Sequence, residues 1–176
     1  MLVLQLQHDV EGRIKMDFDT YRFTSAETAK AARFTQSGFH MMFKRGNFQI
    51  RDGEGTAAPQ NGLPNLFNLR AVIGFALTNE LMTFGVPAKI GFQASKAYTH
   101  ISEGAREPSG LFDIHKQGYT GFIFWPDAGH GRTFSYESAP TRQDLFRDLN
   151  HPENKFCFVQ MNNLHNRIAH ELRIAE

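Results

Sequence analysis

The segment of residues 65–84, NLFNLRAVIGFALTNELMTF, constrains the fold more than any other part of the sequence. It carries only two charged residues, Arg70 and Glu80. Its apolar residues recur at steps of three and four, the spacing of one face of an α-helix. The positions on this face are Leu66, Leu69, Ile73, Leu77, Leu81 and Phe84. Further apolar side chains lie outside the face, so such a helix must be covered on several sides. We therefore expect residues 65–84 to form the long central helix of the core.

Local signals mark both ends of this predicted helix. Asn65 can accept a hydrogen bond from a backbone N–H of the first turn, so it is the expected N-cap. Gly85 suits the left-handed conformation that commonly follows a helix, and Pro87 prevents continuation. Gly74, in the middle of the helix, is less favourable there than alanine by about 1 kcal/mol. Its presence predicts that another part of the backbone passes close to the helix at that point.

The composition is that of one globular domain. A chain of 176 residues can bury one good core and is short for two domains. The formal net charge of +1 is neutral evidence on nucleic-acid binding. The single cysteine, Cys157, excludes an internal disulfide and any zinc site built from cysteines. We expect one domain over residues 1–176, without a cofactor.

No segment predicts association with a membrane. The start of the chain, MLVLQLQHD, lacks the basic residues and the long apolar run of a signal peptide. Residues 65–84 are long enough to cross a bilayer, but Arg70 and Glu80 argue against it. We therefore expect a cytoplasmic protein, or a virion component made in the cytoplasm of a host.

Phenylalanine is unusually common, with 17 residues against four tyrosines and one tryptophan. This excess predicts a core rich in aromatic packing, together with some aromatic surface that faces other proteins.

The other elements alternate between extended and helical patterns. We expect an N-terminal hairpin turning at residues 10–12, a helix over 26–36 capped by Thr24 or Ser25, and a second hairpin over 39–51 turning at Gly46 and Asn47. A polar loop over 52–64 precedes the central helix, and a strand over 88–101 follows it. Antiparallel strands over 118–126 and 132–137, a short helix over 141–149, a strand over 155–161 and a final helix capped by Asn162 or Asn163 complete the prediction. The fold class is α+β, with a mostly antiparallel sheet packed on the central helix.

One order of elements matches a known arrangement. From residue 13 to about residue 101 the expected order is strand, helix, strand, strand, helix, strand, which is the ferredoxin-like βαββαβ order. The prediction is therefore a ferredoxin-like core with a β-rich C-terminal extension. Many RNA-handling proteins share this core, including the repeat-associated proteins of CRISPR systems, but it hosts too many functions to indicate one.

The first candidate for chemistry is the turn WPDAGHGRTFSY, residues 125–136. Glycines on both sides of His130 allow a tight backbone, so Asp127, His130 and Arg132 would project from the tip. Such a turn could present a general acid or base beside a cation that holds a phosphate. The alternative is a solvated hairpin loop whose glycines only satisfy the geometry of the turn.

A second candidate rests on two short motifs. The segment TYRFTSAETAKAARFTQSGF is similar to the first motif of the Arg-Ser-Glu ADP-ribosyltransferases, an arginine on a strand followed by a helix and a Gly-Phe turn. The segment FSYES resembles their serine motif, and Glu171 lies a comparable distance downstream. The resemblance implies that Arg22 holds a dinucleotide and that Ser135 and Glu171 complete the catalytic set.

A third candidate is a basic and aromatic segment, HMMFKRGNFQIR, residues 40–51. The expected phosphate contacts of a nucleic-acid surface are Lys44, Arg45, Arg51 and Arg132. Phe43 and Phe48 would then stack on bases. In the alternative interpretation, strand alternation turns Phe43 and Phe48 toward the core and leaves Lys44 and Arg45 to solubilise a turn.

The histidines do not predict a metal site. His165 and His170 are five residues apart on the final helix, about 140° around its axis, so they cannot bind one metal together. We expect no metal.

No nucleophile, base and stabilising group occur together at a recognisable spacing. We therefore expect a non-catalytic binding or assembly subunit of a phage particle or a nucleoprotein complex. Its expected partners are other protein subunits, a second copy of the chain, and nucleic acid. The alternatives are a nucleic-acid-processing enzyme that uses a histidine as general acid or base, and an ADP-ribosyltransferase of the Arg-Ser-Glu type.

Overall fold

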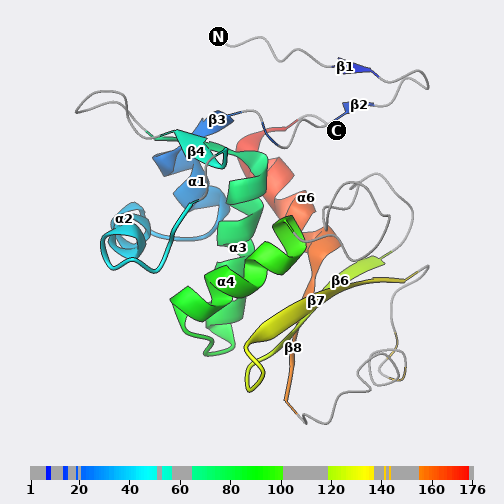
Figure 1. Cartoon of the computed structure of the whole chain (residues 1–176). Coiled ribbons are helices and arrows are strands. Elements are labelled where there is room, and N and C mark those ends of the chain that lie inside the picture. Colours follow the sequence, from blue (N-terminus) through cyan, green and yellow to red (C-terminus); the bar gives the residue numbers. More distant parts are fainter. Residues whose placement is uncertain are drawn as a thin grey trace.

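The chain is arranged around one buried helix, α3 (Leu69–Thr83), as Figure 1 shows. The computed structural model describes residues 7–8, 14–15, 19, 21–50, 53–56, 65–100, 119–136, 141, 143 and 155–174. Within this part of the chain, α3 contacts three helices and three strands. The helices are α1 (Ser25–Ala31), α4 (Ala88–Thr99) and α6 (Met161–Leu172), and the strands are β3 (Tyr21–Thr24), β5 (Leu66–Asn68) and β8 (Cys157–Gln160). The predicted central helix is confirmed.

Two small three-stranded antiparallel sheets accompany the helices. One has the order β3-β5-β4, where β4 is Gly55–Thr56. The other has the order β7-β6-β8, where β6 is Tyr119–Trp125 and β7 is His130–Tyr136. Figure 1 shows the helices lying between these two sheets. The α+β class is therefore confirmed, but two three-stranded sheets replace the single expected sheet.

The start of α3 lies four residues later than the sequence predicts. Residues 66–68 form β5, which pairs with β3 and β4, so Asn65 is not the cap. Instead Asn68 caps the helix, because its Oδ1 accepts a hydrogen bond of 2.8 Å from the backbone N–H of Ala71. Its Nδ2 donates to the carbonyl of Gly53 at 2.8 Å, which fixes the chain just before β4. One buried asparagine thus joins the sheet to the helix.

Residues 88–99 form α4, and the predicted strand over 88–101 is wrong. The helix begins after Pro87 and packs along α3. Gly91 lies against α3, where an added Cβ would be 3.5 Å from Thr78 and 3.6 Å from Leu81. Gly74 of α3 faces Ser95 and Thr99 of α4 in the same way. The close approach expected at Gly74 is therefore made by a helix, through its side chains.

The second predicted hairpin, over residues 39–51, is also a helix. Residues 36–44 form α2 (Gln36–Lys44), whose N-cap Thr35 accepts a hydrogen bond of 3.1 Å from the N–H of Gly38. Phe39 and Phe43 are one helical turn apart and turn toward the core. Their ring centroids are 5.2 Å apart, and that of Phe39 is 5.0 Å from Phe75 of α3. The interpretation that Phe43 and Phe48 face the core is confirmed, although helical periodicity and not strand alternation places Phe43.

Phenylalanine fills the core. The buried ones are Phe23, Phe39, Phe48, Phe67, Phe75, Phe92, Phe122 and Phe124. Among the residues with a described burial, only Phe84 is an exposed phenylalanine, at 56%. Aromatic packing inside the domain accounts for the excess, so the excess no longer argues for an aromatic surface that faces other proteins.

Four helices end with a residue in the left-handed conformation. After α2 this residue is Gly46 (φ 67°), and after α3 it is Gly85 (φ 84°), as the sequence predicts. After α1 it is Arg33 (φ 59°), and after α6 it is Arg173 (φ 52°). An L-residue in this conformation costs about 1–2 kcal/mol, which glycine avoids. The two arginines therefore carry backbone strain.

The helix predicted over residues 26–36 is shorter in the structure. Its predicted cap is confirmed: Thr24 Oγ1 accepts from the N–H of Glu27 at 3.3 Å, and Glu27 Oε2 accepts from the N–H of Thr24 at 2.8 Å. α1 ends at Ala31 because Arg33 turns left-handed, and Thr35 then caps α2.

The sheet of β6, β7 and β8 agrees with the sequence prediction. β6 pairs with β7 from Tyr119–Tyr136 to Trp125–His130 and with β8 on its other side. One face of this sheet packs against the main core through Phe122, Phe124, Cys157 and Val159. Gly131 is needed here, because an added Cβ would lie 2.1 Å from the ring of Phe122.

The last helix, α6, is confirmed, but its predicted caps are not. Gln160 occupies the N-cap position, and no side chain caps the first turn. Asn162 instead accepts a hydrogen bond of 2.6 Å from the N–H of Thr120, which ties α6 to β6.

The ferredoxin-like order is not what the structure shows. Between residues 21 and 99 the described elements run β3, α1, α2, β4, β5, α3, α4, so helices stand where two of the expected strands would be. The N-terminal hairpin is represented by β1 (Gln7–His8), which pairs antiparallel with β2 (Ile14–Lys15). The helix predicted over 141–149 and most of the loop predicted over 52–64 lie outside the described residues. In the described part, no helix is both long enough and apolar enough to span a bilayer.

The burial of α3 gives a stability prediction. Leu77 is fully buried in the core, so Leu77→Ala should lower the free energy of unfolding by about 2–5 kcal/mol, measured by denaturant melts. Phe84→Ala, at the exposed end of the same helix, should cost less than about 1 kcal/mol. A loss for Leu77→Ala as small as that of the control would mean that α3 is peripheral.

Candidate functional site

The hairpin of β6 and β7 carries the three residues of the first chemical candidate. Asp127 lies in the turn, while His130 and Arg132 are two apart on β7 and so share one face of the strand; all three are exposed. The ring of His130 lies 5.2 Å from that of Trp125, and the guanidinium of Arg132 lies 5.4 Å from the ring of Phe134. The structure thus places the histidine and the arginine beside aromatic rings on one exposed hairpin.

The three residues of the ADP-ribosyltransferase candidate lie on three elements. Arg22 is on β3, Ser135 is on β7 in the other sheet, and Glu171 is on α6. The side chains of Arg22 and Ser135 lie outside the described part of the structure. The Glu171 carboxylate pairs with Lys30 of α1 at 2.8 Å, and the hydrogen bond and charge of Lys30 lower the pKa of Glu171. Glu171 therefore links α6 to α1.

The basic residues of the third candidate lie at the end of α2. Lys44 is the last residue of the helix and Arg45 follows it, both exposed. Cations are favourable at this end, because the helix dipole is negative there. Arg51 lies outside the described residues, and Arg132 belongs to the other sheet. The structure therefore keeps Lys44 and Arg45 together at the end of α2, and it places Arg132 on a different element, β7.

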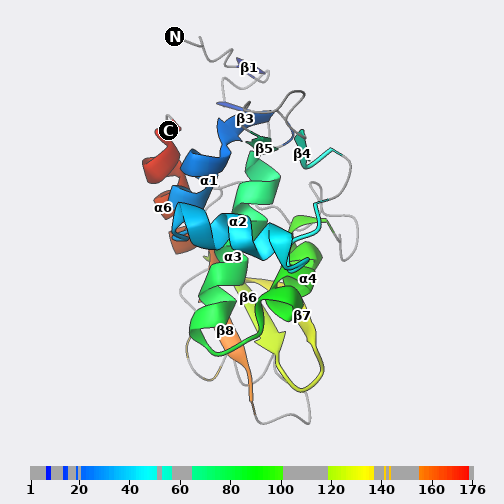
Figure 2. The same cartoon turned by 90° about the vertical axis from the view of Figure 1, so that its left-hand side faces the viewer.

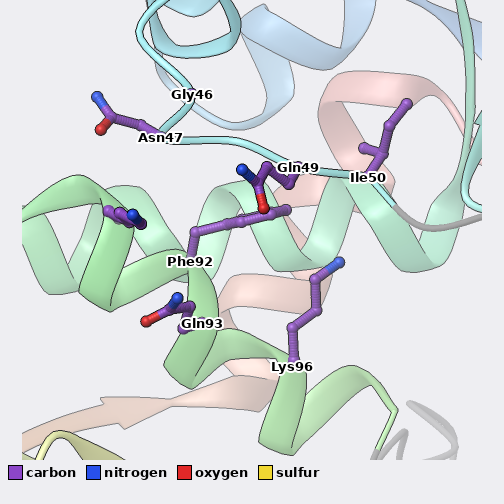
Figure 3. Close-up of a pocket in the computed structure, with 8 residues that line it drawn as sticks. Gly46, Asn47, Gln49, Ile50, Phe92, Gln93 and Lys96 are labelled. Atoms are coloured by element: carbon purple, nitrogen blue, oxygen red, sulfur yellow. The ribbon is translucent and has the colours of Figure 1, made fainter.

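A groove of about 310 Å³ lies directly after these two cations, between residues 46–50 and α4 (Figure 3). Its walls carry amide side chains from both sides, at Asn47, Gln49 and Gln93. Figure 3 shows Gln49 pointing from the 46–50 segment toward Phe92, whose ring lies across the bottom of the groove. Lys89 and Lys96 of α4 complete the lining with Gly46 and Ile50. The groove is thus polar and positively charged above an apolar floor.

A buried cluster of charges closes one end of this groove. Lys96 is only 9% exposed, and its Nζ lies 4.4 Å from the centre of the Phe92 ring. The same ammonium group forms an ion pair with Oε1 of Glu54, which is 2% exposed. His100 Nε2 lies 3.0 Å from that oxygen. One carboxylate therefore holds both a lysine and a histidine.

Neighbouring polar groups fix this cluster in place. His100 Nδ1 lies 2.6 Å from Thr99 Oγ1, which donates to the carbonyl of Ser95 at 3.2 Å. Arg70 of α3 donates to the carbonyl of Thr99 and pairs with Asp19 at 2.8 Å. The end of α4 is thereby tied to the start of α3. A carboxylate, an ammonium and an imidazole within hydrogen-bond reach can transfer protons, and they can equally satisfy one another as buried charges.

Sequence reasoning missed this cluster for two reasons. Glu54 belongs to a segment predicted to be a polar loop, and it is 42 residues from Lys96. Residues 88–101 were expected to be extended, which would separate Lys96 from His100. Their spacing of four residues was the available signal, since it places two side chains one turn apart on a helix.

His165 and Cys157 are buried and structural. His165 is buried, and its Nε2 lies 2.9 Å from the hydroxyl of Tyr98; burial lowers the pKa of His165 from 6.5 to about 4. His170, on the same helix, is exposed. Burial raises the pKa of the Cys157 thiol, which makes it a poor nucleophile. The described residues contain no group of three or more histidine, cysteine or acidic side chains placed to hold a metal.

Comparison with known proteins adds no relative. No known protein family matches the chain, and no curated protein is detectably similar to it in sequence.

The buried His165 predicts a pH dependence of stability. Its pKa is depressed in the folded state, so between pH 6.5 and 4 the unfolded chain binds more protons, and the free energy of unfolding should fall as the pH falls. At about 1.4 kcal/mol per pKa unit, the loss across this window is about 3 kcal/mol. His165→Gln should remove this contribution to the slope, whereas the exposed control His170→Gln should keep it. Denaturant melts at several pH values would measure the slopes, and equal slopes for all three proteins would contradict the assignment.

Proposed function

We propose that the chain is a non-catalytic binding subunit of a nucleoprotein assembly, and that the groove between residues 46–50 and α4 holds the backbone of a single-stranded nucleic acid. The main support for this proposal is the combination of cations and amide side chains at the groove. Exposed Lys44 and Arg45 directly precede the segment that forms one wall of the groove, Lys89 lines the other wall, and amide side chains line both walls. Ammonium and guanidinium groups neutralise phosphates, and amides donate hydrogen bonds to phosphate and sugar oxygens.

The aromatic residues favour recognition of the backbone over recognition of bases. Phe92 and Phe48 are buried, and Phe43 packs in the aromatic core, so these rings offer little face for a base to stack on. Binding would then depend on charge and hydrogen bonding, which is typical of sequence-tolerant recognition.

The cluster at the end of the groove favours binding over chemistry. Glu54 compensates the charge of Lys96 and also contacts His100, and these groups are buried or half-buried. A histidine that acts as general base must reach the proton it removes. The buried carboxylate instead orients Lys96, which forms part of the lining of the groove.

The assembly part of the proposal draws on exposed apolar side chains near the groove. Met41 of α2 and Ile90 of α4 are exposed. α4 forms one wall of the groove, and α2 ends just before the segment that forms the other wall. Another subunit, or a second copy of the chain, that covers them would also enclose the bound strand. If that other subunit is a virion protein, the assembly is a phage particle.

Salt dependence tests the nucleic-acid groove. Affinity for a single-stranded oligonucleotide, measured by fluorescence anisotropy, should fall steeply with salt, because each phosphate contact contributes about −0.7 to the slope of log affinity against log salt. Arg45→Ala and Lys89→Ala should each weaken binding and flatten the slope by about one contact. Lys155→Ala, an exposed lysine outside the groove, is the control and should keep the slope. Wild-type protein that does not bind at low salt would refute the groove.

The same oligonucleotide distinguishes the enzymatic alternative. For a binding subunit, the strand should remain intact on gels with both wild type and His130→Ala. A nuclease that uses His130 would cut the strand, and His130→Ala would slow cleavage about 10²–10⁴-fold while preserving binding. Cleavage of that kind would replace the non-catalytic proposal.

A further inference from the structure

A second cavity, of about 430 Å³, lies between the C-terminal end of α3, the strand β8 and the first turns of α6. Figure 2 shows α6 on one side of α3 and α4 on the other. The volume falls in the range of small-molecule sites, about 300–1,000 Å³. None of the residues proposed to bind the nucleic-acid strand lines it.

Two arginines give this cavity its charge. Arg33 and Arg167 line it together with one acid, Glu80, so the formal charge of these three is positive. Arg167 pairs with Glu80 through Nη1 only. Its Nε and Nη2 are buried and have no hydrogen-bond partner among the residues that the structure describes. Buried donors without an acceptor are costly, so the described residues leave part of the hydrogen-bonding capacity of Arg167 unmet.

The uncapped start of α6 adds backbone N–H donors to this cavity. Gln160, Asn163, Leu164 and Arg167 of its first two turns line the cavity. No side chain caps this helix, because the amide of Gln160 accepts from Asn163 Nδ2 at 2.8 Å instead of from the backbone. The positive end of the helix dipole therefore favours an anion beside the arginines.

The rest of the lining is aromatic or carries amides. Phe84 projects from the end of α3 and is the most exposed large apolar side chain described. Phe158 of β8 lies in the same lining, next to the paired amides of Gln160 and Asn163. An exposed aromatic ring can stack on a planar base, and amides can bond the donors and acceptors along its edge.

We propose that this cavity binds a nucleoside monophosphate, with the phosphate at Arg33 and Arg167 and the base against Phe84. Guanidinium groups suit phosphate oxygens because they donate in pairs. Inorganic phosphate would leave the aromatic and amide part of the lining unused, and a nucleoside would leave the arginines unused. A ligand with both parts fits the whole lining.

The direct test is calorimetric titration of the full chain with AMP, GMP, CMP and UMP. At least one of them should bind, and at least about tenfold more tightly than its nucleoside or inorganic phosphate, a difference of about 1.4 kcal/mol. If no nucleotide binds at millimolar concentration, the proposal is wrong. Binding of phosphate alone with equal affinity would also overturn it, because the base would then play no part.

A substitution at Arg33 can weaken nucleotide binding without destabilising the fold. Arg33→Gly and Arg173→Gly relieve the same left-handed strain, so both should raise Tm, by about 2–4 °C. Only Arg33 lines the cavity, so only Arg33→Gly should weaken nucleotide binding, by about tenfold or more. Equal nucleotide affinities for the two variants would count against the phosphate site.

Variants at Phe84 and Lys89 test the base contact and separate this cavity from the groove. Phe84→Ala should weaken the nucleotide but not inorganic phosphate, while Ile90→Ala, an exposed apolar control on α4, should leave both unchanged. Lys89→Ala should leave nucleotide binding unchanged and weaken only the oligonucleotide, so failure of one site can be told from failure of the other. Unchanged nucleotide affinity in Phe84→Ala would refute the stacking contact and with it the proposal.

Discussion

The packing of α4 against α3 is the interaction on which the rest of the structure depends. Gly91 brings the two helices close enough for Phe92 to reach Phe75, whose ring it stacks on at 5.5 Å. The same contact sets the rotation of α4 about its axis, and that rotation turns Lys89 and Gln93 to the groove and Lys96 toward Glu54. Because Phe75 is fully buried among other rings, α4 cannot move without opening the densest part of the core. The wall of the groove that α4 provides is therefore fixed before any ligand arrives.

The sequence predicts the elements whose signals are local and unambiguous. α3 is recognisable because its length and apolar character leave no other solution, and α1 because Thr24 and Glu27 form a complete capping box. The errors at α2 and α4 share a physical cause. Gly46 was expected in a hairpin turn, but left-handed backbone is needed equally after a helix, and glycine serves both. Gly91 lies within the predicted strand over 88–101, whereas here it marks a crossing of helices. Glycine is therefore compatible with either kind of element, and the strands expected in place of α2 and α4 suggest a ferredoxin-like order.

The sites are harder to predict than the fold, because their residues come from distant parts of the chain. Lys44 and Arg45 could be found, since two adjacent exposed cations are visible in any local pattern. The opposite wall of the groove could not, because it requires α4 to be a helix. Glu54 reaches Lys96 only through the pairing of β4 with β5, which Asn68 secures. The second cavity combines the junction of α1 and α2, the end of α3 and the start of α6, and only the packed structure brings Arg33, Phe84 and Arg167 together.

The position of α3 between the two cavities bears on how they would work together. Coupling between two sites requires an element with two arrangements whose balance both ligands shift. α3 is enclosed by helices and strands, and most of its side chains are buried, so it offers no second packing of similar energy. The two cavities are therefore built to act independently, each through side chains at the edge of the core. The small net charge of the chain conceals this arrangement, because Glu54 offsets Lys96 at one site and Glu80 offsets Arg167 at the other. What remains at each site is a modest positive excess held on a rigid frame, which is what the proposed phosphate contacts require.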